Sequence, residues 1–251
     1  MEFQARPRRR GLAIGDAVGE AYVELDPAGL ARLEDAIQAR AVAGGTCLKS
    51  PNVWRQADWV FKFYAEERGL LDRVRRHAAL RSARAQGRIR PVASPEPIAA
   101  FAFRTARGGF DGLLVTRFVA GRSLGEVWSI GRESRDALGR FLADMSERRV
   151  WHGDLHPGNL LWDGERWWLL DLDGLRSGPL RRLDPRRERE AWTRLHFNLR
   201  LDPEFAAVHR AALGHLGRAD RHGSEWAEID VRAREIAASR GPDPWHGRGP
   251  A

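Results

Sequence analysis

Three side chains that could bind a metal ion or move a proton lie close together in one stretch of the sequence. Asp154 and Asn159 fall within the turn sequence HGDLHPGN, and Asp171 ends the apolar run that follows it. Two short apolar segments separated by Asp163 and Gly164 predict a β-hairpin between these polar positions. A hydrophobic core requires none of these oxygen-bearing side chains, so their proximity indicates chemistry.

The predicted hairpin brings Asn159 toward Asp171. A loop of two or three residues would pair Asn159 with residue 168 or 169, and Asp171 would lie two or three residues beyond that pair. At roughly 3.3 Å per residue along a strand and about 5 Å between strands, the two side chains would lie within about 10 Å. Mg²⁺ suits this gap because it takes few protein oxygens and keeps water or phosphate as its other ligands. Asp173 has the same strand parity as Asp171 and is the fallback ligand.

The spacing of Asp154 and Asn159 favours phosphoryl transfer, although both residue types also occur in ordinary turns. D-x-x-x-x-N is the spacing at which a kinase catalytic loop places its base and a metal-binding asparagine. Asp154 would accept the proton of an attacking hydroxyl, while Asn159 and Asp171 would hold Mg²⁺ on the nucleotide phosphates. This small set suffices, because phosphoryl transfer needs mainly positioning and neutralisation of charge. His152 is expected to hold the loop by hydrogen bonds rather than to catalyse.

Only two lysines are available to bind the nucleotide phosphates, because the chain contains no others. Lys62 lies in a β-prone run ahead of a helical pattern, and Lys49 lies nearer the expected phosphate loop. We prefer Lys62; the alternative is an exposed lysine on an edge strand. The helical pattern over residues 66–87 contains no glutamate at a suitable spacing to pair with Lys62, and the side chain of Asp72 is short.

The remaining pattern predicts the elements that position these residues. We expect an N-terminal leader over 1–40, a sheet-rich lobe over 41–119, a mainly helical lobe over 120–240 and a tail over 241–251. Apolar residues that recur on one helix face predict a helix over 133–148, which leads directly into the turn sequence. The expected architecture is α+β, with a cleft between the two lobes.

The composition restricts the class of protein. Its 251 residues suffice for one large domain or two lobes, and a hydrophobic content of 43% supports a buried core. The single cysteine, Cys47, excludes an intrachain disulfide framework and a cysteine zinc site, and it fits a reducing compartment. With no signal sequence and no long apolar run, a cytoplasmic location is expected. The net charge of +8 fits an anionic partner or a GC-rich genome, and no nucleic-acid recognition motif accompanies it.

Several of these segments together resemble a known family. HGDLHPGNLL followed by LLDLDGL resembles the protein-kinase-like superfamily in its bacterial small-molecule branch. More narrowly, VFKFYAEERGLLDRVRRHAALRSARA, SPEPIA and LLVTRFVAGRSL are similar to bacterial lipopolysaccharide core kinases, which phosphorylate Kdo or heptose of the inner core. The resemblance spans roughly residues 44–200. Its most specific motif, HGDLHPGN, is shared with aminoglycoside and choline phosphotransferases.

The resemblance implies a two-lobed protein-kinase-like fold and an ATP- and Mg²⁺-dependent kinase. The acceptor would be a small molecule or a glycolipid. The location implied is the cytoplasm, with peripheral contact at the inner membrane as a further option. The resemblance does not specify the oligomeric state. Site residues are carried over by their motifs: the base is Asp154, the Mg²⁺ ligands are Asn159 and Asp171, and the phosphate-binding lysine is Lys62.

The resemblance also places an adenine-binding hinge at Arg117, Phe118 and Val119, which would hold the base through backbone groups. The expected glycine-rich loop departs from the family pattern, because GGTCLKS lacks G-x-G-x-x-G. Two alternatives to the core kinase remain. One is the same chemistry on another acceptor, such as an aminoglycoside or a protein hydroxyl, and the other is a nucleotide-binding protein without catalysis.

Overall fold

The structure is a computed structural model that describes residues 10–49, 52–67, 77–86, 88–89, 92–105, 109–128, 132–176 and 185–240. The chain divides into two compact units. The first comprises Met1–Arg90, Ser94–Ala120 and Asp171–Asp173, and the second comprises Pro91–Ala93, Gly121–Leu170 and Gly174–Ala251. Asp171–Asp173 thus belongs to the first unit, although its neighbours in the sequence on both sides belong to the second.

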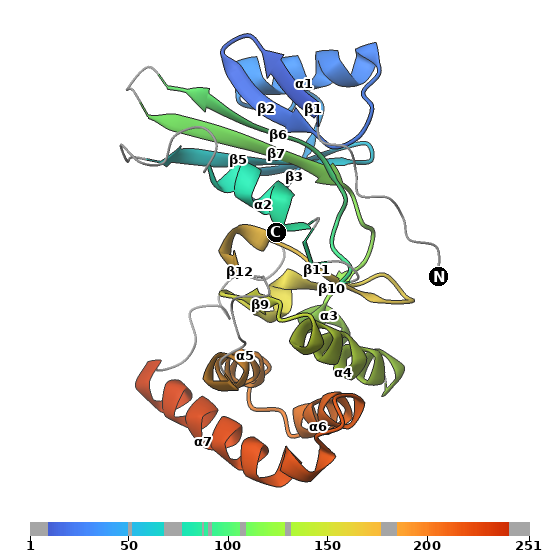
Figure 1. The fold of residues 1–251 in the computed structure, drawn as a ribbon, viewed down its shortest axis with the longest axis vertical. Coiled ribbons are helices and arrows are strands. Elements are labelled where there is room, and N and C mark those ends of the chain that lie inside the picture. The colour runs from blue at the N-terminus through green and yellow to red at the C-terminus, as the bar shows by residue number, and fades with distance from the viewer. Residues whose placement is uncertain are drawn as a thin grey trace. The chain divides into compact units, whose positions relative to one another are not determined.

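An antiparallel sheet forms the first unit (Figure 1). In the described part of the chain it has seven strands in the order β1-β2-β6-β7-β5-β4-β3. In sequence order these are β1 Arg10–Ile14, β2 Ala17–Ala21, β3 Thr46–Lys49, β4 Val53–Gln56, β5 Trp59–Glu67, β6 Pro97–Arg104 and β7 Phe110–Arg117. β6 is buried at every position except Arg104, which is typical of a central strand covered on both faces.

Two helices cover opposite faces of this sheet (Figure 1). The helix α1, Pro27–Ala39, packs its buried side chains against Phe101 and Leu113, and α2, Ala78–Gln86, packs against their neighbours in the strands, including Leu114. Successive residues of a strand point to opposite faces, so each strand serves both helices. Lys62 pairs in register with Leu114 and therefore lies on the α2 face.

Residues 10–39, which the sequence places in a separate leader, contribute β1, β2 and α1 to the first unit. The strand signal of β2 is weak because its sequence, AVGEA, is rich in small residues. Small size is nevertheless required there, since a Cβ on Gly19 would lie 2.2 Å from the carbonyl oxygen of Ala100 in β6. β2 is therefore specified by its pairing with β6 rather than by local propensity.

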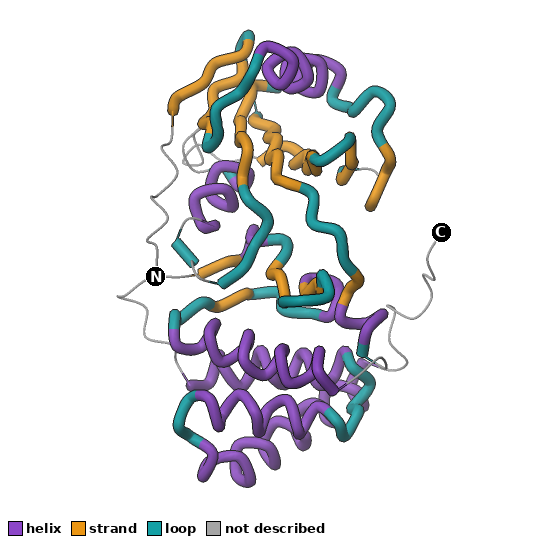
Figure 2. The backbone as a smooth tube through the Cα atoms, turned by 90° about the vertical axis from the view of Figure 1, so that its right-hand side faces the viewer, coloured by secondary structure: helices purple, strands orange, loops and turns teal. Residues whose placement is uncertain are grey.

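Helices dominate the second unit, and Figure 2 shows them packed side by side (purple). They are α3 Leu124–Val127, α4 Arg132–Glu147, α5 Pro185–Asn198, α6 Phe205–His215 and α7 His222–Arg240, with the 3₁₀ turns η2 Pro157–Asn159 and η4 Ala219–Arg221. α4 confirms the helix predicted over 133–148. It approaches α6 closely at Gly139, where a Cβ would lie 2.9 Å from the Cβ of Ala211.

Short strands connect these helices. Within the described residues, a three-stranded sheet has the order β11-β10-β8 and a two-stranded sheet joins β12 to β9. The strands are β8 Arg122–Ser123, β9 Trp151–His152, β10 Leu160–Trp162, β11 Trp167–Leu169 and β12 Leu175–Arg176. A further 3₁₀ turn, η3, spans Leu172–Gly174.

Part of the predicted 66–87 helix is strand, because β5 continues to Glu67 and α2 begins at Ala78. The intervening apolar positions Leu70, Leu71 and Val74 lie outside the described residues, as does the predicted tail over 241–251. No helix in the described part of the chain is both long and apolar enough to cross a bilayer.

Candidate functional site

Lys62 lies at the centre of a group of charged and polar side chains in the first unit. Its Nζ donates to Oδ1 of Asp171 and to Oδ2 of Asp173, both at 2.6 Å. The other carboxylate oxygen of Asp173 accepts hydrogen bonds from the Tyr64 hydroxyl and the Ser82 hydroxyl, again at 2.6 Å. Side chains from three separate parts of the sequence thus hold one another; we call them the lysine cluster.

The fold of the first unit explains why these residues meet. Lys62 and Tyr64 are two residues apart on β5, so both point to the face covered by α2. Ser82 lies on the sheet-facing side of α2, where it is buried among alanines. Asp173 arrives from η3, so no local sequence pattern connects it with the other members of the cluster.

The carboxylates of the lysine cluster stabilise the charged form of Lys62 and the protonated form of Tyr64. Burial acts to lower the pKa of Lys62, but the carboxylates of Asp171 and Asp173 outweigh it, and the pKa is raised above its usual value. Burial and the adjacent Asp173 carboxylate raise the pKa of Tyr64 well above that of an ordinary tyrosine. Lys62 is therefore an ammonium at neutral pH, and Tyr64 is a protonated phenol that donates its hydrogen bond.

The carboxylate that the sequence failed to supply for Lys62 comes from Asp173. The α2 sequence AALRSARAQ contains no acidic residue, and its serine, Ser82, instead donates to Asp173. Sequence reasoning treated Asp173 as a fallback metal ligand, whereas the structure pairs it with Lys62. The available signal was D-x-D, which offers a second carboxylate two residues after Asp171. The alternative partner Asp72 lies outside the described residues.

In the second unit, His152 fixes the loop that carries Asp154. The imidazole is 2% exposed, its Nε2 lies 3.1 Å from the carbonyl oxygen of Leu170, and its Nδ1 accepts the N–H of Asp154 at 3.2 Å. An Nδ1 that accepts places the proton on Nε2, which then donates to Leu170. The prediction that His152 is a structural hydrogen-bonding residue is confirmed.

The Asp154 carboxylate itself points to solvent. Its side chain is 79% exposed and lies 3.8 Å from Nε2 of His156. The backbone beside it is held more firmly, because Arg194 of α5 donates to the carbonyl oxygen of Gly153 at 2.5 Å. A fixed backbone with an exposed carboxylate suits a group that must meet an incoming hydroxyl.

The side-chain amide of Asn159 has a defined orientation. The residue is 5% exposed, and its Nδ2 donates to the carbonyl oxygen of Asp154 at 2.8 Å. Because the amide nitrogen is committed to the loop, the amide oxygen points to the opposite side. That oxygen is the atom that a hard cation takes from asparagine.

Asp171 has the backbone conformation often seen at functional positions. Its φ of +55° lies in the left-handed region, which aspartate tolerates better than most residues but which still costs energy. A carboxylate and an amide oxygen are both ligand types that Mg²⁺ accepts. The assignment of Asp171 and Asn159 as ligands of one metal ion stays a prediction, because the two residues belong to different units.

The hairpin register differs from the prediction. Leu160 pairs with Leu169, so Asn159 lies opposite Leu170, whose N–H donates to the Asn159 carbonyl oxygen at 2.8 Å. The predicted loop of two or three residues is wrong, because four residues, 163–166, separate the strands. The cause is Asp163, whose carboxylate accepts the N–H groups of Glu165 and Arg166 and stabilises a wider turn. Asp171 is consequently one residue beyond the pair.

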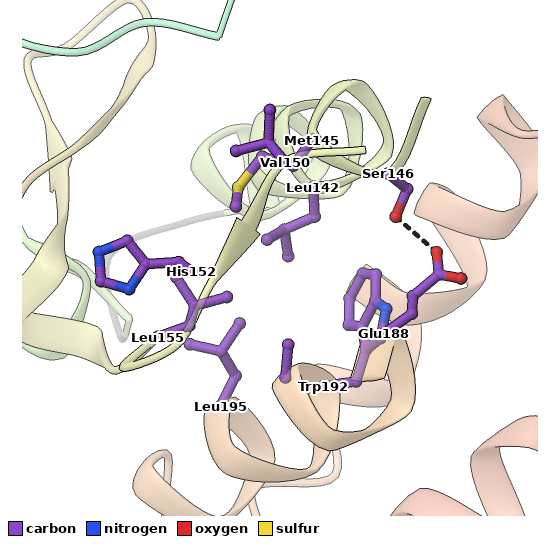
Figure 3. A pocket seen from close by; sticks show the side chains of 10 residues that line it. Leu142, Met145, Ser146, Val150, His152, Leu155, Glu188, Trp192 and Leu195 are labelled. Atoms are coloured by element: carbon purple, nitrogen blue, oxygen red, sulfur yellow. Dashed lines mark hydrogen bonds between the residues drawn. The ribbon is translucent and has the colours of Figure 1, made fainter. Parts of the chain in front are cut away.

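Beneath the Asp154 loop, α4 and α5 enclose a small cavity of about 30 Å³ (Figure 3). Apolar side chains such as Leu142 and Leu195 form most of its wall, and Ser146 donates to Glu188 at 2.5 Å along one side. Sites for small molecules usually enclose about 300–1,000 Å³. This cavity therefore belongs to the packing that supports the loop and is not a substrate site.

Comparison with known proteins identifies the fold. Residues 137–182 match the model of the phosphotransferase enzyme family APH, and that segment contains Asp154, Asn159 and Asp171. No curated protein matches the sequence. The structure of WaaP in complex with acyl carrier protein matches with a TM-score of 0.55 and 15% identity, over 85% of this chain and 98% of that one. The chain has a protein-kinase-like fold.

A weaker likeness to this kinase-like fold exists in WbdD, in its complex with a kinase inhibitor. It has a TM-score of 0.44 and 19% identity, over 78% of this chain and 45% of that one. At these identities the structural likeness shows the fold alone. The predicted α+β, protein-kinase-like fold is confirmed.

The predicted hinge of the kinase-like fold begins at Arg117, the last residue of β7, in the first unit. The N–H of Arg117 donates to the Glu96 carbonyl oxygen at 2.8 Å, and the N–H of Phe118 donates to the Asp58 carbonyl oxygen at 2.7 Å. These two donors are committed to the residues that immediately precede β6 and β5. A backbone N–H offered to adenine by the predicted hinge would therefore come from Val119, and the adenine-binding role of all three residues stays a prediction.

Proposed function

We propose that this chain is an ATP- and Mg²⁺-dependent kinase that phosphorylates a sugar hydroxyl, Kdo or heptose, of the lipopolysaccharide inner core. The observation that carries the proposal is the ammonium of Lys62 held at 2.6 Å from both Asp171 and Asp173. A cation fixed in this way beside a metal-binding carboxylate is what the nucleotide phosphates require in kinases. The APH family match over 137–182 supports the same reaction class.

In the proposed reaction, Asp154 orients the acceptor hydroxyl and accepts its proton. A bond forms between the acceptor oxygen and the γ-phosphorus, the bond from that phosphorus to the β–γ bridging oxygen breaks, and ADP leaves. Lys62 neutralises charge on the nucleotide phosphates. Mg²⁺ held by Asn159 and Asp171 would neutralise further charge on those phosphates.

Asp173 acts as a positioning residue for Lys62 in this proposal. In protein kinases a helix glutamate pairs with the phosphate-binding lysine. Here Tyr64 and Ser82 fix the Asp173 carboxylate, which in turn fixes the ammonium of Lys62. The absence of an acidic residue from α2 therefore does not leave the lysine without a carboxylate.

The assignment of the acceptor rests on the resemblance of several segments to lipopolysaccharide core kinases and on the net charge of +8, which suits an anionic glycolipid. An aminoglycoside acceptor is less suited to this chain, because like charges repel.

The test is to incubate the purified chain with Mg-ATP and deacylated core oligosaccharide and to follow the oligosaccharide by mass spectrometry. We expect the mass of one phosphate to be added by the wild type and not by Asp154→Asn, which should still bind Mg-ATP. Transfer by Asp154→Asn at the wild-type rate would remove Asp154 as the base. Binding of Mg-ATP by the wild type without transfer to core oligosaccharide, an aminoglycoside or a protein would favour the non-catalytic alternative.

A further inference from the structure

A large groove opens beside Asp154 in the second unit. Its volume is about 840 Å³, within the usual range for sites that bind small molecules. The walls come from the Asp154 loop, α5 and α7. Among the residues that the structure describes, four arginines line it: Arg186, Arg189 and Arg194 on α5 and Arg232 on α7.

We propose that this groove binds the acceptor and recognises it through an anionic group, a carboxylate or a phosphate, near the hydroxyl that is phosphorylated. The inference rests on the proposed function, because that function makes Asp154 the base toward which the hydroxyl must point. It adds the residues of the acceptor site and the charge that the acceptor must carry.

Three arginines of the groove already pair with glutamates that a bound anion can replace. Arg186 lies 3.4 Å from Glu190, and Arg189 lies 3.1 Å from Glu228. Arg232 lies 2.7 Å from Glu235. Arg186 and Arg232 are mostly exposed and Arg189 is 36% exposed, and exposed ion pairs contribute only about 0–1 kcal/mol. A carboxylate or phosphate can therefore replace a glutamate and take a bidentate hydrogen bond from the guanidinium.

The charges along the groove favour an anion. Among the described lining residues, the four arginines face three carboxylates, Asp154, Glu190 and Glu228, so the arginines are in excess by one. The partner of Arg194 is the uncharged carbonyl group of Gly153, which leaves the guanidinium charge without compensation from that contact. A polycationic acceptor would bring ammonium groups against these guanidinium groups, which is unfavourable.

The groove also has an apolar part. Phe197 of α5 and Ile229 and Ile236 of α7 contribute to the wall. Ring faces of sugars present C–H groups, and aromatic and aliphatic side chains supply the matching surface in many sites. An apolar strip beside arginines suits an acidic sugar better than inorganic phosphate.

The experiment measures binding by calorimetry without ATP, so that no turnover interferes. The probes are deacylated core oligosaccharide, the same oligosaccharide after carboxyl reduction and dephosphorylation, and inorganic phosphate. The test variants of the full chain are the double variant Arg189→Gln with Arg232→Gln and the single variant Arg189→Lys. The matched control is Arg187→Gln, an exposed arginine of α5 that does not line the groove.

We expect the double variant to bind the anionic oligosaccharide at least about tenfold more weakly, since hydrogen bonds to charged groups are at stake. Arg189→Lys should give an intermediate loss, because it keeps the charge and loses the bidentate geometry. Arg187→Gln should stay within about twofold of wild type, and the neutralised oligosaccharide and inorganic phosphate should bind weakly. Thermal midpoints check that each variant is folded.

Three results would overturn the inference: equal binding by the double variant, equal binding of the neutralised oligosaccharide, or an equal loss in Arg187→Gln. Phosphate transfer and Mg-ATP binding are measured on the same proteins. These measurements distinguish failure of the groove inference from failure of the proposed kinase function. If the wild type transfers phosphate and the groove variants transfer it equally well, the groove is not the acceptor site, and the proposed kinase function stands. If the groove variants weaken binding but no protein transfers phosphate, the proposed kinase function is wrong, and the groove remains an anion-binding site.

Discussion

Side chains hold one another around Lys62, whereas around Asp154 the hydrogen bonds hold the backbone. In the lysine cluster, Asp173 accepts from Lys62, Tyr64 and Ser82, and only 23% of the lysine side chain is exposed. In the Asp154 loop, the contacts from His152, Asn159 and Arg194 reach main-chain atoms. The carboxylate of Asp154 remains 79% exposed.

The proposed roles give this difference a physical reason. A cation for nucleotide phosphates meets the same ligand in every cycle, so fixing its geometry in advance lowers the cost of organising the charge. A general base must admit an acceptor, so its backbone can be fixed while the carboxylate stays accessible. The comparison predicts that changes in the cluster alter stability as well as activity, and that changes at Asp154 alter activity alone.

The largest expected effect is that of Asp154→Asn on turnover. Loss of a general base typically costs 10²–10⁴ in rate, so we expect kcat to fall about 1,000-fold, with the KM for ATP and the thermal midpoint nearly unchanged. Steady-state kinetics measure kcat and the KM for ATP, and calorimetry measures the thermal midpoint. Asp144→Asn, an exposed aspartate on α4, is the control and should match wild type. A large loss of thermal stability in Asp154→Asn would contradict the expectation that changes at Asp154 alter activity alone.

Acid should weaken the second unit through His209, which is fully buried. Burial and the neighbouring His222 lower the pKa of His209 to about 4. The unfolded chain, with a histidine pKa near 6.5, binds the proton first as the pH falls. The stability associated with the neutral imidazole is therefore present above about pH 6.5 and lost as the pH falls toward 4, by roughly 3 kcal/mol.

Urea unfolding between pH 7 and pH 4.5 measures this loss, with tryptophan fluorescence as the signal. His209→Gln removes the titrating group and should flatten the pH dependence, although it lowers stability at neutral pH. Over the same pH range Lys62 stays charged, because its pKa is raised. An unchanged slope in His209→Gln would contradict the assignment to this histidine.

Asp173→Asn should affect both stability and ATP affinity. The substitution leaves Lys62 with Asp171 as its carboxylate partner in the cluster, and the partial exposure of the group limits the cost to about 1–2 kcal/mol. We expect the KM for ATP to rise about tenfold while the KM for the acceptor stays constant, together with a lower thermal midpoint. A purely structural role would lower the midpoint and leave the two KM values in their original ratio. Asp35→Asn, exposed on α1, is the control.

Ser82→Ala should have the smallest effect. It removes one hydrogen bond to Asp173, typically worth about 1 kcal/mol, and leaves the carboxylate in contact with Lys62 and Tyr64. The KM for ATP should rise less than tenfold, in the same direction as for Asp173→Asn. If the two substitutions combine additively, the proposed route from α2 through Asp173 to Lys62 is wrong, because coupled residues are not additive.

The hairpin after Asn159 shows how far sequence reasoning extends. Asp163 and Gly164 correctly predicted a turn, and the apolar runs correctly predicted two strands. The register was missed, because the Asp163 side chain bonds two backbone N–H groups and widens the loop. Such a bond depends on the side-chain orientation, which the residue type alone does not give.

The sequence by itself determined the local geometry of the loop that carries Asp154. HGDLHPGN has a fixed spacing, and its contacts, such as Asn159 Nδ2 to the Asp154 carbonyl group, join residues five apart. The preference for Lys62 also followed from the sequence, since the chain has only two lysines. These features depend on short separations and on residue type, which a sequence displays directly.

Only the tertiary structure decided the partner of Lys62 and the walls of the groove. Asp173 is 111 residues from Lys62, and the groove joins the Asp154 loop to α5 and α7. Contacts at such separations depend on how strands pair and helices pack, and no local propensity encodes them. The helix α2 shows the same limit: its own sequence has no acidic residue, and the fold brings the carboxylate of Asp173 to Ser82 from a distant part of the chain.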